Sequence, residues 1–258
     1  MKIIKGTEKG FFAVANDTAR HISQCIQNNE EWFVGWGEET LYYDSSHGSN
    51  VWEYYFKQTY TYTEPNSVVS DYTELVRNGS FRETMYFIYS NFFILNEKTE
   101  KLLSTHYDFF ANNNVLGVHI RRTDKFLSGT GPNLAPVDLH LFKKEIDEVI
   151  NNYDAIYLAT DCDEAYQYIK NLYGKKVIAN QNGNRGTGTQ SIHNDYKHIS
   201  GYKKGLDVLT DVIFLSKCKH LIRSSSNVSV TSLYINPELT YLNLNEKYLG
   251  DDESCIVA

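Results

Sequence analysis

Charged side chains gather in the segment GVHIRRTDKF, residues 117–126. Arg121 and Arg122 follow a short apolar run and are themselves followed by Asp124 and Lys125. A guanidinium group can hold two phosphate oxygens in a fork, a geometry that a lysine ammonium group does not offer. The segment is therefore typical either of an anion-binding site or of a strand end held by internal ion pairs, and taken alone it leaves both open.

A second polar group, RSSSN, stands where a strand is expected to pass into a helix. Its hydroxyl groups and the backbone N–H groups of the helix start could bind an anion, or the serines could simply cap the helix. This group comprises Ser224, Ser225, Ser226 and Asn227.

Two aspartates carry further candidate chemistry. Asp161, in ATDCDEAY, follows an apolar run and forms an Asp-x-Asp pair with Asp163 that is also found in manganese sites, although an aspartate there is a routine helix cap. Asp211 lies inside the apolar stretch VLTDVIFL, where a buried carboxylate needs hydrogen-bond donors. Guanine offers two such donors, N1–H and N2–H2, which uracil lacks, but a salt bridge or an exposed helix position would also suffice.

Alternating apolar and amphipathic segments from residue 115 onward predict the elements that position these groups. We expect strands at 115–120, 155–160, 175–180 and 219–223, with amphipathic helices between them and a last helix after the serines. Such an alternation favours a parallel sheet with helices on both faces, which binds ligands at the carboxyl ends of its strands. All the polar groups named above except Asp211 directly follow a predicted strand.

The first 110 or so residues are less regular. They predict a helix capped by Asn16 or Asp17, a strand at 30–36 and a helix over 96–110. The chain has 20 tyrosines, which favour either an aromatic core or a face on which sugar rings stack.

Bulk properties narrow the class of protein. A net charge of −7 argues against a general nucleic-acid or membrane-surface binder, because those need a cationic field. No apolar run is long enough for a secretion signal or a membrane anchor, and the four cysteines lack CxxC spacing. We therefore expect a cytoplasmic protein with reduced thiols.

The segment GVHIRRTDK resembles the first motif of the α1,6-fucosyltransferase group, which includes the nodulation fucosyltransferases and is related to the α1,2- and protein O-fucosyltransferases. YLATD and LTDVIFLSKCKHLIRSSSNVS resemble the second and third motifs of this group, in the same order and at similar spacing. The resemblance covers roughly residues 96 to 236.

The resemblance implies a GT-B-like α/β fold. Its parallel, Rossmann-type C-terminal domain, 113–258, would bind the nucleotide sugar, and a smaller, less regular N-terminal domain, 1–112, would face the acceptor. It implies an inverting, metal-independent transfer of L-fucose from GDP-fucose to a carbohydrate acceptor, with no cofactor. The absence of a membrane anchor fits the cytoplasm of a bacterium or of a virus-infected cell, and the acceptor would be a cell-surface or capsid glycan precursor.

The resemblance also assigns roles. Arg121 would hold the β-phosphate and neutralise the departing GDP, while His119 and Asp211 would recognise guanine. The turn from Ser225 to Asn227 would bind the diphosphate, and Asp161 would line the nucleotide or acceptor cleft. The expected catalytic residues are Arg121, Asp124 and Lys125, and the expected nucleotide-binding residues are His119, Arg121, Arg122, Asp161, Asp211, Ser224, Ser225, Ser226 and Asn227.

The sequence departs from the family pattern at two places. The α1,6 enzymes have a glutamate that helps to activate the acceptor four residues after the motif lysine, whereas Gly129 stands four residues after Lys125 here. Asp124, Asp138 or an N-terminal carboxylate could act as the base instead, or a loose transition state could need little help. The Ser-Ser-Gln of the third motif also reads Ser226-Asn227-Val228.

Three alternatives stay open. The same fold could use another nucleotide sugar, for example UDP-xylose, or it could be a non-catalytic module that binds a nucleotide or a glycan. A manganese-dependent transferase that uses Asp161 and Asp163 would be fully inhibited by EDTA.

Overall fold

The computed structural model describes residues 1–60, 81–123, 136–180, 183–187 and 199–250. The chain divides into two compact units. The first comprises Met1–Ser104, Tyr196–Leu206 and Tyr234–Pro237, and the second comprises Thr105–Asp195, Asp207–Leu233 and Glu238–Ala258. No helix in the described part of the chain is long and apolar enough to cross a membrane.

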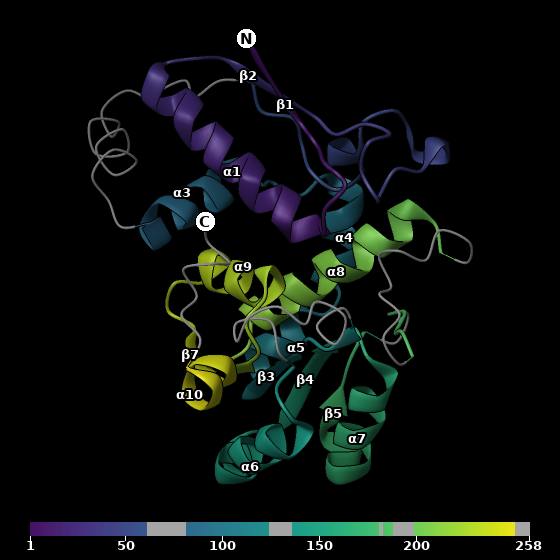
Figure 1. Ribbon diagram of the computed structural model, residues 1–258, viewed down its shortest axis with the longest axis vertical. Helices are drawn as coiled ribbons and strands as arrows, with labels where there is room; N and C mark the ends of the chain where they lie inside the picture. Colours follow the sequence, from purple (N-terminus) through teal and green to yellow (C-terminus); the bar gives the residue numbers. More distant parts are fainter. Residues whose placement is uncertain (61–80, 124–135, 181–182, 188–198, 251–258) are drawn as a thin grey trace. The chain divides into compact units, whose positions relative to one another are not determined.

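The second unit is built on a five-stranded sheet in which every neighbouring pair is parallel (Figure 1). The spatial order of the strands is β5-β4-β3-β6-β7. The chain order therefore reverses direction between β3 and β6, and such a switch point is where open α/β sheets bind ligands. The strands are β3 (Val115–Ile120), β4 (Ala155–Thr160), β5 (Val177–Ile178), β6 (His220–Arg223) and β7 (Thr240–Asn243).

This sheet confirms the predicted parallel α/β organisation. The helix after the serines, α9 (Asn227–Ile235), was expected to be the last element, and this expectation is wrong because β7 and α10 (Leu244–Leu249) follow it. Two of the four residues of β7 are exposed, so the strand lacks the continuous apolar run that marks the buried strands.

Helices cover both faces of the sheet. On one face, Val118 and Ile120 of β3 pack with Phe142 and Ile169 in an apolar cluster. On the other face, the aromatic rings of α5 and α8 lie against β4. The described helices of this unit are α5 (Tyr107–Asn112), α6 (Leu139–Val149), α7 (Asp163–Tyr173), parts of α8 (Gly201–Ser216) and α9, and α10, with 3-10 turns at Ile150–Asn152 and Gly174–Lys176. Asp138 caps α6, because its side chain accepts a hydrogen bond from the N–H of His140 (3.0 Å).

The first unit contains two parallel strands, β1 (Lys2–Lys5) and β2 (Trp32–Gly35), joined by the long helix α1 (Phe11–Asn28). Figure 1 shows α1 running past both strands with α3 beside it, and these elements are in contact. The remaining elements are α3 (Phe81–Phe92), α4 (Glu97–Ser104) and 3-10 turns at Ser45–His47 and Val51–Tyr54.

Two expectations about helix ends are wrong. Helix α1 begins after Gly10, so Asn16 and Asp17 lie inside it and do not cap it. The apolar residues that precede them already face the core, which extends the helix by more than a turn. Asn16 instead accepts a buried hydrogen bond from the hydroxyl group of Tyr89 (2.7 Å). The single helix expected over 96–110 is two helices, α4 and α5.

The core of the first unit is aromatic. The ring of Phe11 meets the rings of Trp36, Tyr42 and Tyr55 edge to face, at centroid distances of 5.1–5.5 Å. All four side chains are buried, and T-shaped pairs at this separation are favourable. For Tyr42 and Tyr55 the core interpretation of the abundant tyrosines is therefore correct.

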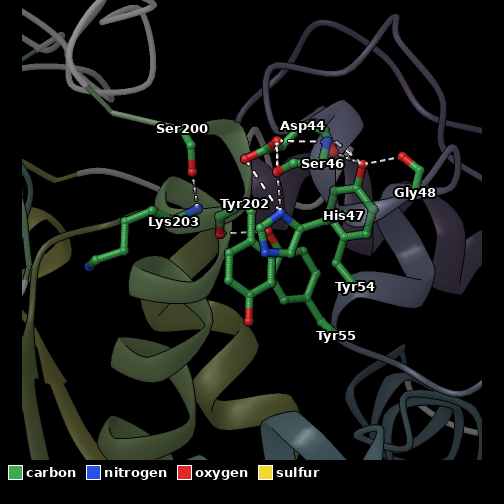
Figure 2. Close-up of polar contacts among 9 residues, drawn as sticks. All are labelled: Asp44, Ser46, His47, Gly48, Tyr54, Tyr55, Ser200, Tyr202 and Lys203. Carbon is green, nitrogen blue, oxygen red and sulfur yellow. Dashed lines mark hydrogen bonds and ion pairs between the residues drawn. The ribbon is translucent and has the colours of Figure 1, made fainter.

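The first turns of α8 also belong to this unit, because the boundary between the units falls after Leu206. Tyr202 stacks on His47, with ring centroids 3.8 Å apart, and on Tyr55 at 5.6 Å (Figure 2). Tyr55 also donates a hydrogen bond from its hydroxyl group to the carbonyl of Tyr202 (2.8 Å). The first turn of α8, which starts at Gly201, is thus packed into the aromatic core of the first unit.

Candidate functional site

The turn that follows β3 is held by Asp161 at the end of β4. The carboxylate of Asp161 accepts hydrogen bonds from the N–H groups of Arg122 (3.0 Å) and Thr123 (3.3 Å). It also accepts one from the hydroxyl group of Thr123 (2.5 Å). The side chain that was expected to line a cleft therefore shapes the backbone from which Arg121 projects.

Arg121 links three strand ends. Its Nη1 lies 3.0 Å from Oδ2 of Asp161, and its backbone N–H donates to Oγ of Ser224 (2.8 Å). We call Arg121, Asp161 and Ser224 the strand-end cluster. The Arg121 side chain is still 22% exposed, and a guanidinium group has five N–H donors, so the ion pair with Asp161 is compatible with an anionic ligand. The two interpretations of GVHIRRTDKF thus do not exclude each other.

Arg122 points to a different partner. Its Nη1 donates to the carbonyl oxygen of Val137 (3.1 Å), in the segment that leads into α6. This contact joins the turn after β3 to the segment before α6, and the expected contact with a nucleotide stays a prediction. The other members of the first motif, Asp124 and Lys125, and the divergent Gly129 lie outside the described residues.

His119 is buried one residue before the end of β3. It is 4% exposed, and its Nδ1 has no hydrogen-bond partner among the described residues. Burial lowers the pKa of His119 from 6.5 to about 4, and the positive charges of Arg121 and Arg223 act in the same direction, although Asp161 opposes them. The imidazole is therefore neutral at physiological pH, with a nitrogen available for a ligand.

Arg223 is the residue of this edge that the sequence analysis did not single out. It ends β6, pairs in register with His119, and is fully buried. Its guanidinium group donates to Oγ of Ser229 (3.3 Å) and lies 4.8 Å from the ring centroid of Tyr241. The sequence feature that could have identified Arg223 is its place at the end of the apolar run HLIR, directly before the serines.

The serine turn is held mainly by internal hydrogen bonds. The backbone N–H of Ser225 donates to Oδ1 of Asn245 (2.8 Å). The hydroxyl group of Ser225 is hydrogen-bonded to the side-chain amide of Asn243. Oγ of Ser226 accepts from the N–H of Ser229 (3.4 Å), which is helix capping. Because these hydroxyl groups are engaged, an anion at this turn would be bound by backbone N–H groups at the start of α9, where Asn227 is the first residue.

Asp211 has a donor, as a carboxylate in an apolar helix requires. The hydroxyl group of Tyr157 donates to Oδ1 of Asp211 (2.8 Å). Tyr157 stands in β4 at the position in register with Gly117 of β3, two residues before His119. One donor to this carboxylate is therefore the buried hydroxyl group of Tyr157, a partner that was not among the predicted ones.

Asp161 and Asp163 do not form part of a larger metal-ligating group in the described residues. No three His, Cys, Asp or Glu side chains there gather in an arrangement that could hold a metal ion.

Arg185, in the loop after β5, stacks on the ring of Tyr166 at 4.1 Å and donates to the carbonyl of Asn180 (3.2 Å).

No protein-family model and no curated protein sequence matches the chain. Solved structures do match. A structure of the NodZ α1,6-fucosyltransferase soaked with GDP-fucose matches with a TM-score of 0.63 and 15% identity over 96% of each chain. The fucosyltransferase NodZ from Bradyrhizobium, containing selenomethionine, matches with the same values, and NodZ co-crystallised with GDP matches with a TM-score of 0.60 over 90% of each chain. The expected GT-B-like α/β fold is thus confirmed, and the chain is similar in fold to the NodZ α1,6-fucosyltransferase.

Proposed function

We propose that the chain is an inverting glycosyltransferase that transfers L-fucose from GDP-fucose to a glycan acceptor without a metal ion. The observation that carries this proposal is the strand-end cluster, which lies at the switch point of a Rossmann-type sheet in a fold similar to that of NodZ. A partly exposed guanidinium group at this point is well suited to a nucleoside diphosphate.

In this reaction the acceptor hydroxyl oxygen attacks C1 of fucose from the face opposite to the nucleotide. The bond between C1 and the β-phosphate oxygen breaks, and GDP leaves with the electron pair. Arg121 would neutralise the charge that develops on the leaving phosphate, and a donor fixed by Asp161 and Ser224 loses little energy to reorganisation. The start of α9 would contribute backbone N–H groups to the same diphosphate.

The proton of the acceptor needs a base. Hydrogen bonds from the backbone and side chain of His140 lower the pKa of the Asp138 carboxyl group, which makes Asp138 a weaker base than an ordinary aspartate. Among the candidates we assign the base to Asp124, which belongs to the first motif. Lys125, the next residue, would stabilise charge near the reacting atoms. By the same proposal, residues 113–258 bind the donor and residues 1–112 face the acceptor.

Replacing Arg121 by alanine tests the proposal. Turnover should fall by at least about a hundredfold, because a preorganised donor to the developing charge is lost. The matched control is Lys143→Ala, which removes the ion pair of Lys143 with Asp147 on the exposed face of α6 and should leave turnover unchanged. Circular dichroism of both variants checks that they are folded.

Two results would contradict the proposal. Unchanged turnover in Arg121→Ala would remove the cluster from the reaction. Failure of the unaltered protein to consume any nucleotide sugar, with or without an acceptor, would favour the non-catalytic binding module. Calorimetry with GDP and UDP separates the donors, since tighter binding of UDP would favour a UDP-sugar such as UDP-xylose.

A further inference from the structure

Tyr157 of β4 holds its hydroxyl group in a cage of aromatic rings. The side chain is 3% exposed, and its ring meets Phe110 of α5 at 5.7 Å and Phe214 of α8 at 5.5 Å, both edge to face. A phenylalanine would fill this cage equally well. A buried hydroxyl group lowers stability unless it is hydrogen-bonded, so its presence calls for a specific partner.

That partner is Asp211, three residues before Phe214 in the same helix. The distance from the hydroxyl oxygen of Tyr157 to Oδ1 is 2.8 Å. Burial, and next the negative charge of Asp211, raise the pKa of Tyr157 well above its ordinary value. The hydroxyl group is therefore protonated and acts as the donor.

The cage makes this bond directional. The Tyr157 ring is fixed by its aromatic neighbours, so its hydroxyl group fixes one oxygen of Asp211 in turn. Asp211 is only half-buried, and a carboxylate can accept about four hydrogen bonds, so this bond is compatible with further donors from a ligand. A carboxylate oriented before its ligand arrives loses less conformational entropy on binding.

We infer that Tyr157 is a positioning residue that orients the Asp211 carboxylate towards a nucleobase with two adjacent N–H donors, as guanine has. This inference rests on the proposed function and adds the residue that sets the preference for guanine over uracil. Tyr157 itself does not touch the base. It acts through Asp211.

The test compares binding of GDP and UDP to the unaltered protein and to Tyr157→Phe by calorimetry. We expect GDP to bind about three- to tenfold more weakly to Tyr157→Phe, because the Asp211 carboxylate is then oriented only when the ligand binds. The affinity for UDP should be unchanged, so that the preference for GDP narrows by the same factor.

The chain offers a closely matched control. Tyr173 in α7 also donates to an aspartate oxygen, Oδ1 of Asp147, at 2.8 Å, and neither residue is among the candidate site residues. Tyr173→Phe removes the same kind of bond and should leave both affinities unchanged. A second variant, Asp211→Asn, keeps an oxygen that can accept from Tyr157 but replaces the other by an NH2 group, which repels the donors of guanine; it should lose the preference for GDP.

The outcomes separate the inference from the proposed function. An unchanged preference for GDP in Tyr157→Phe, together with its loss in Asp211→Asn, would overturn only the inference. An equal weakening of GDP and UDP in Tyr157→Phe, accompanied by a lower unfolding midpoint, would overturn it too, because it would show a structural role only. A preference for UDP in the unaltered protein would overturn both.

Discussion

His119 is a buried imidazole whose protonation state couples the candidate site to the stability of the fold. Its pKa is lowered from 6.5 to about 4 by burial, with Arg121 and Arg223 reinforcing the effect and Asp161 opposing it. The unfolded chain therefore binds a proton at a higher pH than the folded chain does. Stability is unaffected above the unfolded pKa and falls as the pH decreases from about 6.5 to about 4.

This difference predicts a pH dependence that one substitution should remove. Between about pH 7 and about pH 5, His119 should lower the free energy of unfolding by about 2 kcal/mol. Urea unfolding at the two pH values measures this change, and in His119→Gln the dependence should be smaller by that amount. The control is His21→Gln, which replaces an exposed histidine of α1 and should leave the dependence as it is. Identical pH dependence in His119→Gln and the unaltered protein would contradict the assignment.

Helix α8 contains a residue that local preference disfavours, because Gly205 lies in its interior. Glycine disfavours a helix by about 1 kcal/mol relative to alanine. Tertiary packing accounts for it: a Cβ at Gly205 would lie 2.7 Å from Cζ of Tyr55, closer still to its hydroxyl oxygen, and 3.2 Å from Phe11. The aromatic core of the first unit leaves no room for a side chain.

Gly205→Ala should therefore destabilise the protein although alanine is the better helix former. We expect a loss of about 1–3 kcal/mol from overpacking, measured by urea unfolding. A double-mutant cycle with Tyr55→Phe supplies the control. Tyr55→Phe removes the hydrogen bond to the carbonyl of Tyr202 that fixes the ring, so the ring can shift and Gly205→Ala should cost less in that background. Additive losses, or a more stable Gly205→Ala, would show that Tyr55 does not set the restriction.

The elements also show how far the sequence could predict the structure. The buried strands β3, β4 and β6 were predictable because their apolar runs are continuous, and the serines and Asp161 were placed correctly after them. Arg223 and Tyr157 were not recognised as partners of His119 and Asp211. Their proximity depends on strand register and on how a helix crosses a sheet, and neither is encoded in local sequence periodicity.

At the scale of the whole molecule, two units with separate cores share a chain of net charge −7. An anionic donor is disfavoured by that overall charge, so its binding depends on local cations such as Arg121. Each candidate residue that the structure describes, from His119 to Asn227, belongs to the second unit. The proposed donor site can therefore be located by finding which segments of the chain are stabilised when GDP binds.

Hydrogen exchange with and without GDP should show this location. At GDP concentrations about a hundred times the dissociation constant, binding stabilises the protein by about 2.7 kcal/mol. Exchange should slow most in peptides that contain the end of β3 and the start of α9, because their backbone groups adjoin the proposed diphosphate site. Peptides from α1, in the core of the first unit, serve as the internal control. UDP at the same concentration tests whether the slowing depends on the nucleobase. Slowing confined to α1 and the strands it joins would place the nucleotide in the other unit and contradict the division of roles between residues 113–258 and residues 1–112.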